Sequence, residues 1–244
     1  MRIDVVTIFP GYFEAPLATS MLARAASKGL VEFHVHDLRA FAADRHRTVD
    51  DSPFGGGGGM VLKPEPVAAA WEALDLGRGH GIYLTADGRR LDQQTAARLS
   101  LQPHLVLLCG HYKGLDERVR RRVADEEISI GDYVLTGGEP AAAVLIDAVT
   151  RLVPGVLGNF SSALEDSFHD DLLDCPWYTR PAEYAGEEVP QVLLGGDHEQ
   201  VQAWRRRQAL RRTFERRPDL LETAQLDESE RELIDAWSRG SVNE

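Results

Sequence analysis

The sequence predicts an α/β protein built on a parallel sheet, followed by a smaller and mostly helical second domain. Short apolar runs bounded by glycine, at residues 82–85 and 105–109, are typical of strands buried on both faces of a parallel sheet. Such runs alternate with helix-like segments over residues 1–155, which is the pattern of an α/β sheet. After residue 190 only helical patterns remain.

The individual elements follow from hydrophobic periodicity and from glycine and proline signals. Residues 3–8 predict a buried strand, which ends before Pro10-Gly11. Residues 31–36 predict a strand with one solvent-exposed face. Gly29 is a suitable C-terminal cap for a helix over 20–28. A strand-like segment over 127–131 is followed by glycines. The remaining expected helices cover 64–74, 116–124, 141–152, 198–216 and 229–238.

These patterns divide the chain into three parts. We expect an α/β domain over 1–157 and a helical domain over 174–244. Between them, residues 158–173 are small and acidic without a sustained period, which predicts a flexible linker.

Composition restricts the class of protein. A net charge of −12 argues against a protein that coats nucleic acid without specificity, although a local basic surface is compatible with it. No apolar run approaches the ~20 residues that cross a bilayer, and the first residues lack a signal-peptide core. The two cysteines, Cys109 and Cys175, form no CxxC pair, so we expect a cytoplasmic protein without a disulfide framework and without a membrane partner.

The basic residues cluster in the second domain. Residues 205–217 hold seven arginines and one acidic residue. At ~100° per residue, Arg205, Arg212 and Arg216 share one helix face, so we expect them to point outward and bind phosphate. A solvated face balanced by the acidic tail over 218–244 is the alternative, and the pattern does not decide between them.

Three glycine-bearing loops are candidate binding elements. The run Gly55–Gly59 is neither a P-loop nor a dinucleotide fingerprint, and it predicts either a flexible surface loop or a backbone that a flat base approaches closely. The loops at 109–114 and 131–139 each follow a predicted strand, where open α/β sheets bind ligands. They suggest one shared pocket, although turns alone also explain the glycines. His34 and His36 have no partner nearby in sequence, so no metal site is expected.

Several strings, taken in order, resemble one family: the bacterial tRNA (guanine-N1)-methyltransferases of the knotted SPOUT superfamily. They cover essentially the whole chain. The strings are IFP (8–10), DRHRTVDD (44–51), CG (109–110), DERV (116–119), SIGDYVL (129–135), GGE (137–139), PGVLG (154–158), EDSF (165–168), LDCP (173–176) and YTRP (178–181).

The resemblance implies a deep trefoil knot in the parallel α/β sheet, which general topology rules would not predict. It implies S-adenosylmethionine as the methyl donor, a homodimer with each active site at the interface, and tRNA gripped by the helical domain. The expected target is N1 of the guanine immediately 3′ of the anticodon. The same resemblance assigns site residues. The donor-binding residues would be Tyr83, Leu84, Thr85, Ala86, Gly110, Tyr112, Ile130, Gly131, Asp132, Tyr133, Val134, Leu135, Gly137 and Gly138.

Asp166 would be the general base and Arg151 its electrostatic partner, while Asp50 and the glycines Gly55, Gly57 and Gly59 would lie near the RNA base. These roles suit the chemistry, because guanine N1 carries a proton at neutral pH that a carboxylate accepts. A guanidinium at O6 stabilises the negative charge that then develops on that oxygen. Lys113 departs from the family pattern, where many members have Glu, and a lysine there would suit an RNA phosphate. Two alternatives remain: a ribose 2′-O-methyltransferase of the same superfamily, and an RNA-binding relative without catalysis.

Overall fold

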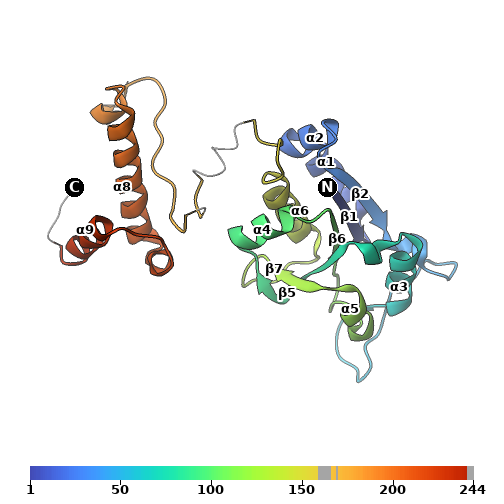
Figure 1. Cartoon of the computed structure of the whole chain (residues 1–244). Helices are drawn as coiled ribbons and strands as arrows, with labels where there is room; N and C mark the ends of the chain where they lie inside the picture. The colour runs from blue at the N-terminus through green and yellow to red at the C-terminus, as the bar shows by residue number, and fades with distance from the viewer. Residues whose placement is uncertain (159–165, 169, 241–244) are drawn as a thin grey trace. The chain divides into compact units, whose positions relative to one another are not determined.

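The computed structural model describes residues 1–158, 166–168 and 170–240. The chain forms two compact units, Met1–Phe160 and Ser161–Glu244 (Figure 1). Of the expected linker over 158–173, residues 159–165 and 169 lie outside the described part of the chain. No helix among the described residues is both long and apolar enough to cross a membrane.

The first unit contains a five-stranded parallel sheet with the order β2-β1-β6-β5-β7. The strands are β1 (Arg2–Thr7), β2 (Glu32–Asp37), β5 (His80–Arg90), β6 (His104–Cys109) and β7 (Glu126–Ser129). In the centre of the sheet, Ile3 pairs with Leu105 of β6 and Phe33 of β2. The prediction of an α/β fold with buried parallel strands is therefore confirmed.

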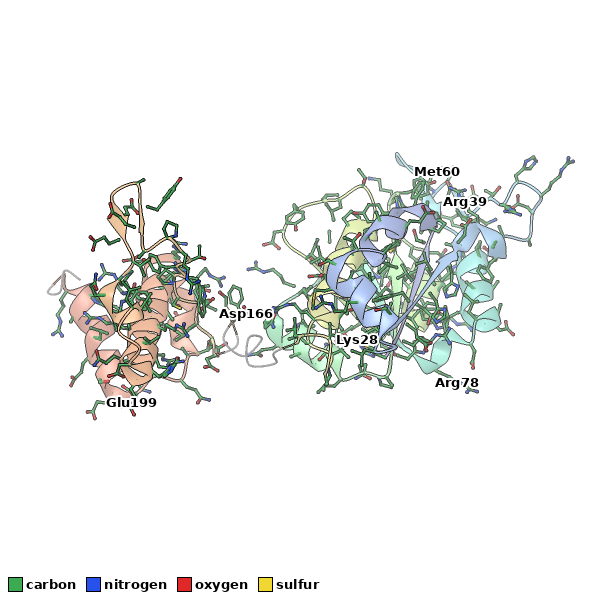
Figure 2. All side chains as sticks on the ribbon, turned by 90° about the horizontal axis from the view of Figure 1, so that it is seen from above. Lys28, Arg39, Met60, Arg78, Asp166 and Glu199 are labelled. Atoms are coloured by element: carbon green, nitrogen blue, oxygen red, sulfur yellow. The ribbon has the colours of Figure 1, made fainter. Side chains whose placement is uncertain are left out.

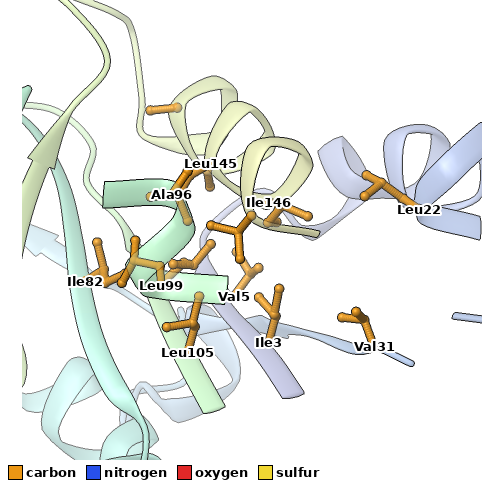
Figure 3. Close-up of a cluster of buried hydrophobic side chains, with 14 of the residues drawn as sticks. Ile3, Val5, Leu22, Val31, Ile82, Ala96, Leu99, Leu105, Leu145 and Ile146 are labelled. Atoms are coloured by element: carbon orange, nitrogen blue, oxygen red, sulfur yellow. The ribbon is translucent and has the colours of Figure 1, made fainter. Parts of the chain in front are cut away.

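Helices cover both faces of this sheet because side chains of each strand alternate between them. On one face, Val5 and Leu107 pack with α2 (Ser20–Ser27), α4 (Gln93–Ser100) and α6 (Glu139–Thr150). Figure 3 shows part of this cluster, with Leu99 of α4 and Leu145 and Ile146 of α6 beside strand residues. On the other face, Val6 and Leu108 pack with α3 (Pro64–Ala73) and α5 (Glu117–Val123).

Short elements complete the first unit. Asp92 caps α4, which periodicity had not predicted, by accepting the backbone N–H of Thr95 at 2.7 Å. A two-stranded hairpin joins β3 (Asp50–Asp51) to β4 (Val61–Leu62) around the glycine run. The remaining short helices of this unit are η1 (Pro10–Phe13), α1 (Glu14–Leu17), η2 (Leu38–Phe41) and η3 (Leu76–Arg78).

A buried carboxylate lies inside the sheet. The fully buried side chain of Asp4 accepts hydrogen bonds from Nε2 of His36 at 2.6 Å, Nε2 of His104 at 2.7 Å and the guanidinium of Arg2. Burial opposes ionisation of Asp4, but these hydrogen bonds outweigh it and hold the pKa of the carboxyl well below its usual range. His36, one of the two histidines at which no metal site is expected, therefore belongs to this hydrogen-bond network inside the sheet.

Among its described residues, the second unit has the helices α8 (His198–Arg216) and α9 (Glu228–Ser238), with bounds close to those expected. Asp197 caps α8, and Asp227 and Glu230 form a capping box at α9. Leu172, Leu210 and Trp237 form its core. The proline-rich stretch before α8 holds a small hairpin, and the short elements are β8 (Glu183–Tyr184), β9 (Glu187–Glu188), η4 (Gln191–Leu193) and η5 (Pro218–Glu222).

Candidate active site

A cavity of about 350 Å³ opens in the first unit where β5, β6 and β7 end. Residues 83–87, 110–115, 128–131 and 133–138 line it, together with Arg120 and Ala141. Its walls come from residues 83–87 of β5, where the pairing with β7 shifts register, and from the segments at and after the ends of β6 and β7. The topology of the sheet gathers these segments at one edge. The size lies within the range of small-molecule sites.

Glycine lets two of these loops touch through their backbones. The N–H of Gly138 donates to the carbonyl of Gly110 at 2.8 Å. A Cβ on Gly138 would lie 2.8 Å from Cα of Cys109 and 2.9 Å from the nitrogen of Gly110. Those atoms are backbone and have little freedom to move, so a side chain at 138 would force the loops apart. The loops at 109–114 and 131–139 therefore do form one wall, as the sequence suggested.

A network of buried polar side chains fixes the position of the same loops. Glu139, only 3% exposed, lies at the start of α6 and contacts Nε2 of His111 at 2.7 Å through Oε2. Its other oxygen accepts the hydroxyl of Thr7. Two effects raise the pKa of the Cys109 thiol well above its ordinary value. Burial is the larger one, and the negative charge of Glu139 is the smaller one. Cys109 is therefore not a nucleophile at neutral pH.

The two cations of the cavity wall differ in their partners. Arg120 forms ion pairs with Glu127 and Asp87 and lies 5.2 Å from the ring centroid of Tyr83. Burial raises the pKa of the Tyr83 phenol, and the charge of Arg120 partly opposes this effect. Lys113 is exposed, and it forms no ion pair with any residue that the structure describes.

The glycine run lies beside the loop that carries Lys113. A Cβ on Gly59 would lie 3.1 Å from the Lys113 side chain, and the N–H of Lys113 donates to the carbonyl of Met60 at 2.9 Å. Gly55, Gly57 and Gly59 all adopt positive φ, a conformation that favours glycine. Gly55 and Gly57 are exposed with open space around them, and Asp50 pairs with Leu62 at the base of the hairpin.

The structure brings together most of the residues expected to bind the donor. All of them line the cavity except Asp132, whose exposed carboxylate lies 3.6 Å from Nη1 of Arg90. The expectation placed Asp132 at the wall because it continued a matching string, but its side chain turns outward. Sequence reasoning missed other wall residues, among them Asp87, Leu115 and Arg120, which become neighbours only through the sheet.

The expected catalytic pair is divided between the units. Arg151 follows α6 in the first unit, where its N–H donates to the carbonyl of Asp147 at 3.1 Å. Asp166, labelled in Figure 2, lies in the second unit. There it lines a cavity of about 180 Å³ together with Asp170, Asp174, Arg205 and Arg206, among others.

The expectation that Arg205 and Arg212 point outward is wrong. The guanidinium of Arg205 lies 4.4 Å from the ring centroid of Trp177, and Nη1 of Arg212 donates to the carbonyl of Asp174 at 2.9 Å. The 174–177 segment covers this side of α8, which helical periodicity cannot reveal. Arg216 is exposed, as expected.

A parallel α/β sheet with a glycine-lined cavity at the carboxyl ends of its strands is the arrangement of a cofactor-binding α/β enzyme. Comparison with known proteins defines the family within that class. The family model described as tRNA (Guanine-1)-methyltransferase TrmD matches residues 1–223. The chain belongs to this family.

Curated relatives match over nearly their full length. A tRNA (guanine-N(1)-)-methyltransferase of Geotalea uraniireducens is 52% identical over 241 residues, covering 98% of this chain and 98% of the relative. The protein of the same name from Geobacillus kaustophilus is 49% identical over 98% of this chain and 99% of its own. That of Chloroflexus aggregans is 51% identical over 100% of this chain and 98% of its own.

Proposed function

We propose that the protein transfers a methyl group from S-adenosylmethionine to N1 of the guanine immediately 3′ of the tRNA anticodon. The observation that carries the proposal is the cavity of about 350 Å³, whose walls include residues of three strings that carry the family resemblance, at 109–110, 129–135 and 137–139. The names of the relatives, at about half identity over nearly the whole chain, support tRNA guanine-N1 as the substrate class.

The cavity fits the chemical character of the donor. Gly110, Gly137 and Gly138 let the segments of the wall pack against one another without side chains between them. Leu84, Ile128 and Ile130 offer apolar contacts to the faces of a flat adenosine ring. The donor supplies a methyl group that its sulfonium already activates. The protein therefore needs to exclude water, align the guanine and remove one proton.

Asp166 takes the N1 proton of guanine in this proposal. Loss of that proton to the carboxylate makes the lone pair on N1 the nucleophile. A bound donor would supply the methyl group, its C–S bond breaking as the N1–C bond forms and a neutral thioether leaving. Arg151 stabilises the negative charge that spreads to O6. The two residues lie in different compact units. We expect residues 158–174 to gain protection from hydrogen exchange when tRNA binds.

The family resemblance supports further parts of the proposal. These are the trefoil knot, the homodimer with each active site at its interface, and the division into domains at 1–157 and 174–244 with a linker at 158–173. A tRNA substrate favours action in the cytoplasm. We propose no metal ligands, and the described residues contain no cluster of three His, Cys, Asp or Glu side chains that suits a metal ion.

Methyl transfer to an unmodified tRNA transcript tests the proposal, with Asp166→Asn as the variant. General-base catalysis contributes roughly 10²- to 10⁴-fold, so kcat should fall by about that factor. Asp170→Asn is the matched control, because Asp170 lines the same cavity. Full activity of the Asp166 variant would overturn the base assignment.

Mass spectrometry of the digested tRNA identifies the product. A ribose 2′-O-methyl group would favour the superfamily alternative. Calorimetry with S-adenosylmethionine tests the non-catalytic alternative, since a chain that no longer binds the donor gives no heat.

A further inference from the structure

A groove of about 500 Å³ in the second unit is lined by aromatic, aliphatic and basic side chains. Trp177, Tyr178 and Trp204 supply the aromatic rings, and Arg180 and Arg205 supply the charges. We call this the aromatic groove. It lies in the proline-rich stretch and along α8, where sequence patterns indicated only irregular structure and a helix.

These rings are not needed for the core of the unit. The core consists of Leu172, Leu210 and Trp237, with partly buried residues such as Phe214 packed against them. By contrast, Trp177 remains 56% exposed and Tyr178 remains 49% exposed. Two large exposed rings beside one groove are unusual on a surface that has no partner.

Hydrogen bonds fix the position of the Trp177 indole. Its Nε1 donates to Oδ2 of Asp174 at 2.6 Å, and the carbonyl of Asp174 is in turn held by Arg212 at 2.9 Å. Arg205 lies over the indole ring, 4.4 Å from its centroid. The guanidinium occupies one face of the ring, so the remaining exposed area is available to a second flat group. Because the ring is already oriented, little conformational entropy is lost when that group binds.

The positive charge of the groove indicates which kind of ligand binds there. Its lining includes two arginines and no carboxylate, in a chain whose net charge is −12. A nucleotide combines a flat base that stacks on an aromatic ring with a phosphate that suits a guanidinium. An acidic or purely apolar peptide would use one of these features and leave the other without a partner.

We propose that the aromatic groove binds an unpaired base of the tRNA, stacked on Trp177 and Tyr178, with Arg180 near an adjacent phosphate. This inference rests on the proposed function for the identity of the RNA. It adds a contact site beside the cavity that Asp166 lines, since Trp177 and Arg205 line both, and this site contributes to the affinity of the complex.

Binding of an unmodified tRNA transcript to the full-length chain tests the inference. Stacking contributes about 1–3 kcal/mol per base, so Trp177→Ala should raise Kd for the transcript by about 5- to 150-fold. Trp177→Phe retains a stacking ring and should stay within about 3-fold of the unsubstituted chain. Tyr184→Ala is the matched control, because Tyr184 is 78% exposed and lies outside the groove.

Salt titration separates the stacking contact from the phosphate contact. Loss of one phosphate contact reduces the slope of log Kd against log salt by about 0.7–0.9. Arg180→Ala should show this change, whereas Trp177→Ala should leave the slope unchanged. Circular dichroism of each variant shows whether the unit remains folded, and Trp177→Phe keeps the test valid if the alanine variant unfolds.

The outcomes are distinct from those that test the proposed function. If Trp177→Ala and Tyr184→Ala bind the transcript equally well, the inference is overturned. It is also overturned if Trp177→Ala changes the sedimentation of the free protein, since the groove would then be a contact between copies of the chain. If Trp177→Ala alone weakens binding while the methylated atom proves not to be N1, the stacking site stands and the proposed function fails.

Discussion

Nε2 of His111 lies 2.7 Å from Oε2 of Glu139, and this contact joins the loop after β6 to the first residue of α6. Glu139 also accepts the hydroxyl of Thr7, the last residue of β1. One buried carboxylate thus connects the end of β1, the loop after β6 and the start of α6. The glycines that line the cavity are held in place by a group that is itself out of reach of solvent.

Removal of that carboxylate should damage both stability and donor binding. Glu139→Ala leaves the Thr7 hydroxyl and the His111 ring without their acceptor, which should lower the free energy of unfolding by about 2–4 kcal/mol. Urea denaturation measures the stability, and calorimetry measures the affinity for S-adenosylmethionine. Glu139→Gln keeps an acceptor of the same shape and should lose less than half as much; equal losses would mean that the hydrogen bonds are not the cause.

A side chain at position 138 should disturb the cavity. Gly138→Ala places Cβ 2.8 Å from Cα of Cys109, so the two loops must separate. Overpacking of this kind costs about 1–3 kcal/mol, and we expect the affinity for the donor to fall at least 10-fold. Gly158→Ala is the control, because a Cβ there meets nothing within 4 Å. Wild-type affinity in Gly138→Ala would show that the contact between the loops is dispensable.

The buried Asp4 should make stability depend on pH. Because hydrogen bonds from His36, Arg2 and His104 outweigh burial and lower the pKa of Asp4 in the folded state, folding is favoured wherever the unfolded carboxyl would be ionised. This contribution is fully present above the unfolded pKa of about 4 and is lost as the pH falls through the lower folded value. Asp4→Asn should cost about 3 kcal/mol at pH 7.

Chemical denaturation of wild type and Asp4→Asn between pH 7 and roughly pH 3 checks this prediction. The difference in unfolding free energy between the two proteins should shrink as the pH falls. A difference that stays constant would exclude the ionised carboxylate as its source.

Lys113 should contact the RNA backbone and not the donor. It is exposed, lacks an ion-pair partner among the described residues and lies against Gly59 of the glycine run. Lys113→Met should reduce the slope of log Kd for tRNA against log salt by about 0.7–0.9, with donor affinity unchanged. Lys28→Met is the control, because Lys28 donates to the carbonyl of Gly155 away from the cavity. A loss confined to donor affinity would assign Lys113 to the cofactor.

The parts of the fold that followed from the sequence are those in which local pattern and burial agree. The run at 105–109 is apolar throughout because β6 is central and buried on both faces, and it was predicted correctly. The helix at 93–100 was not predicted, since its buried face consists of only Thr95, Ala96 and Leu99.

The residues of the candidate site also fall into those that the sequence indicates and those that only the structure reveals. Gly110 and Gly138 are visible in the sequence, and both positions require glycine because a Cβ would meet the Tyr83 side chain at 110 and the backbone of Cys109 at 138. The outward turn of Asp132 and the stacking of Arg205 on Trp177 depend on contacts between distant segments. No periodicity within one element carries that information, so only the structure reveals it.

The backbone hydrogen bond from Lys113 to Met60 has a thermodynamic consequence. It makes the cavity wall and the glycine hairpin one mechanical unit, so a ligand that restricts either segment alters the conformational freedom of the other. Thermodynamic linkage is reciprocal. If a ligand in the cavity changes the affinity of the hairpin for its own ligand by some factor, the hairpin's ligand changes the affinity of the cavity for its ligand by the same factor.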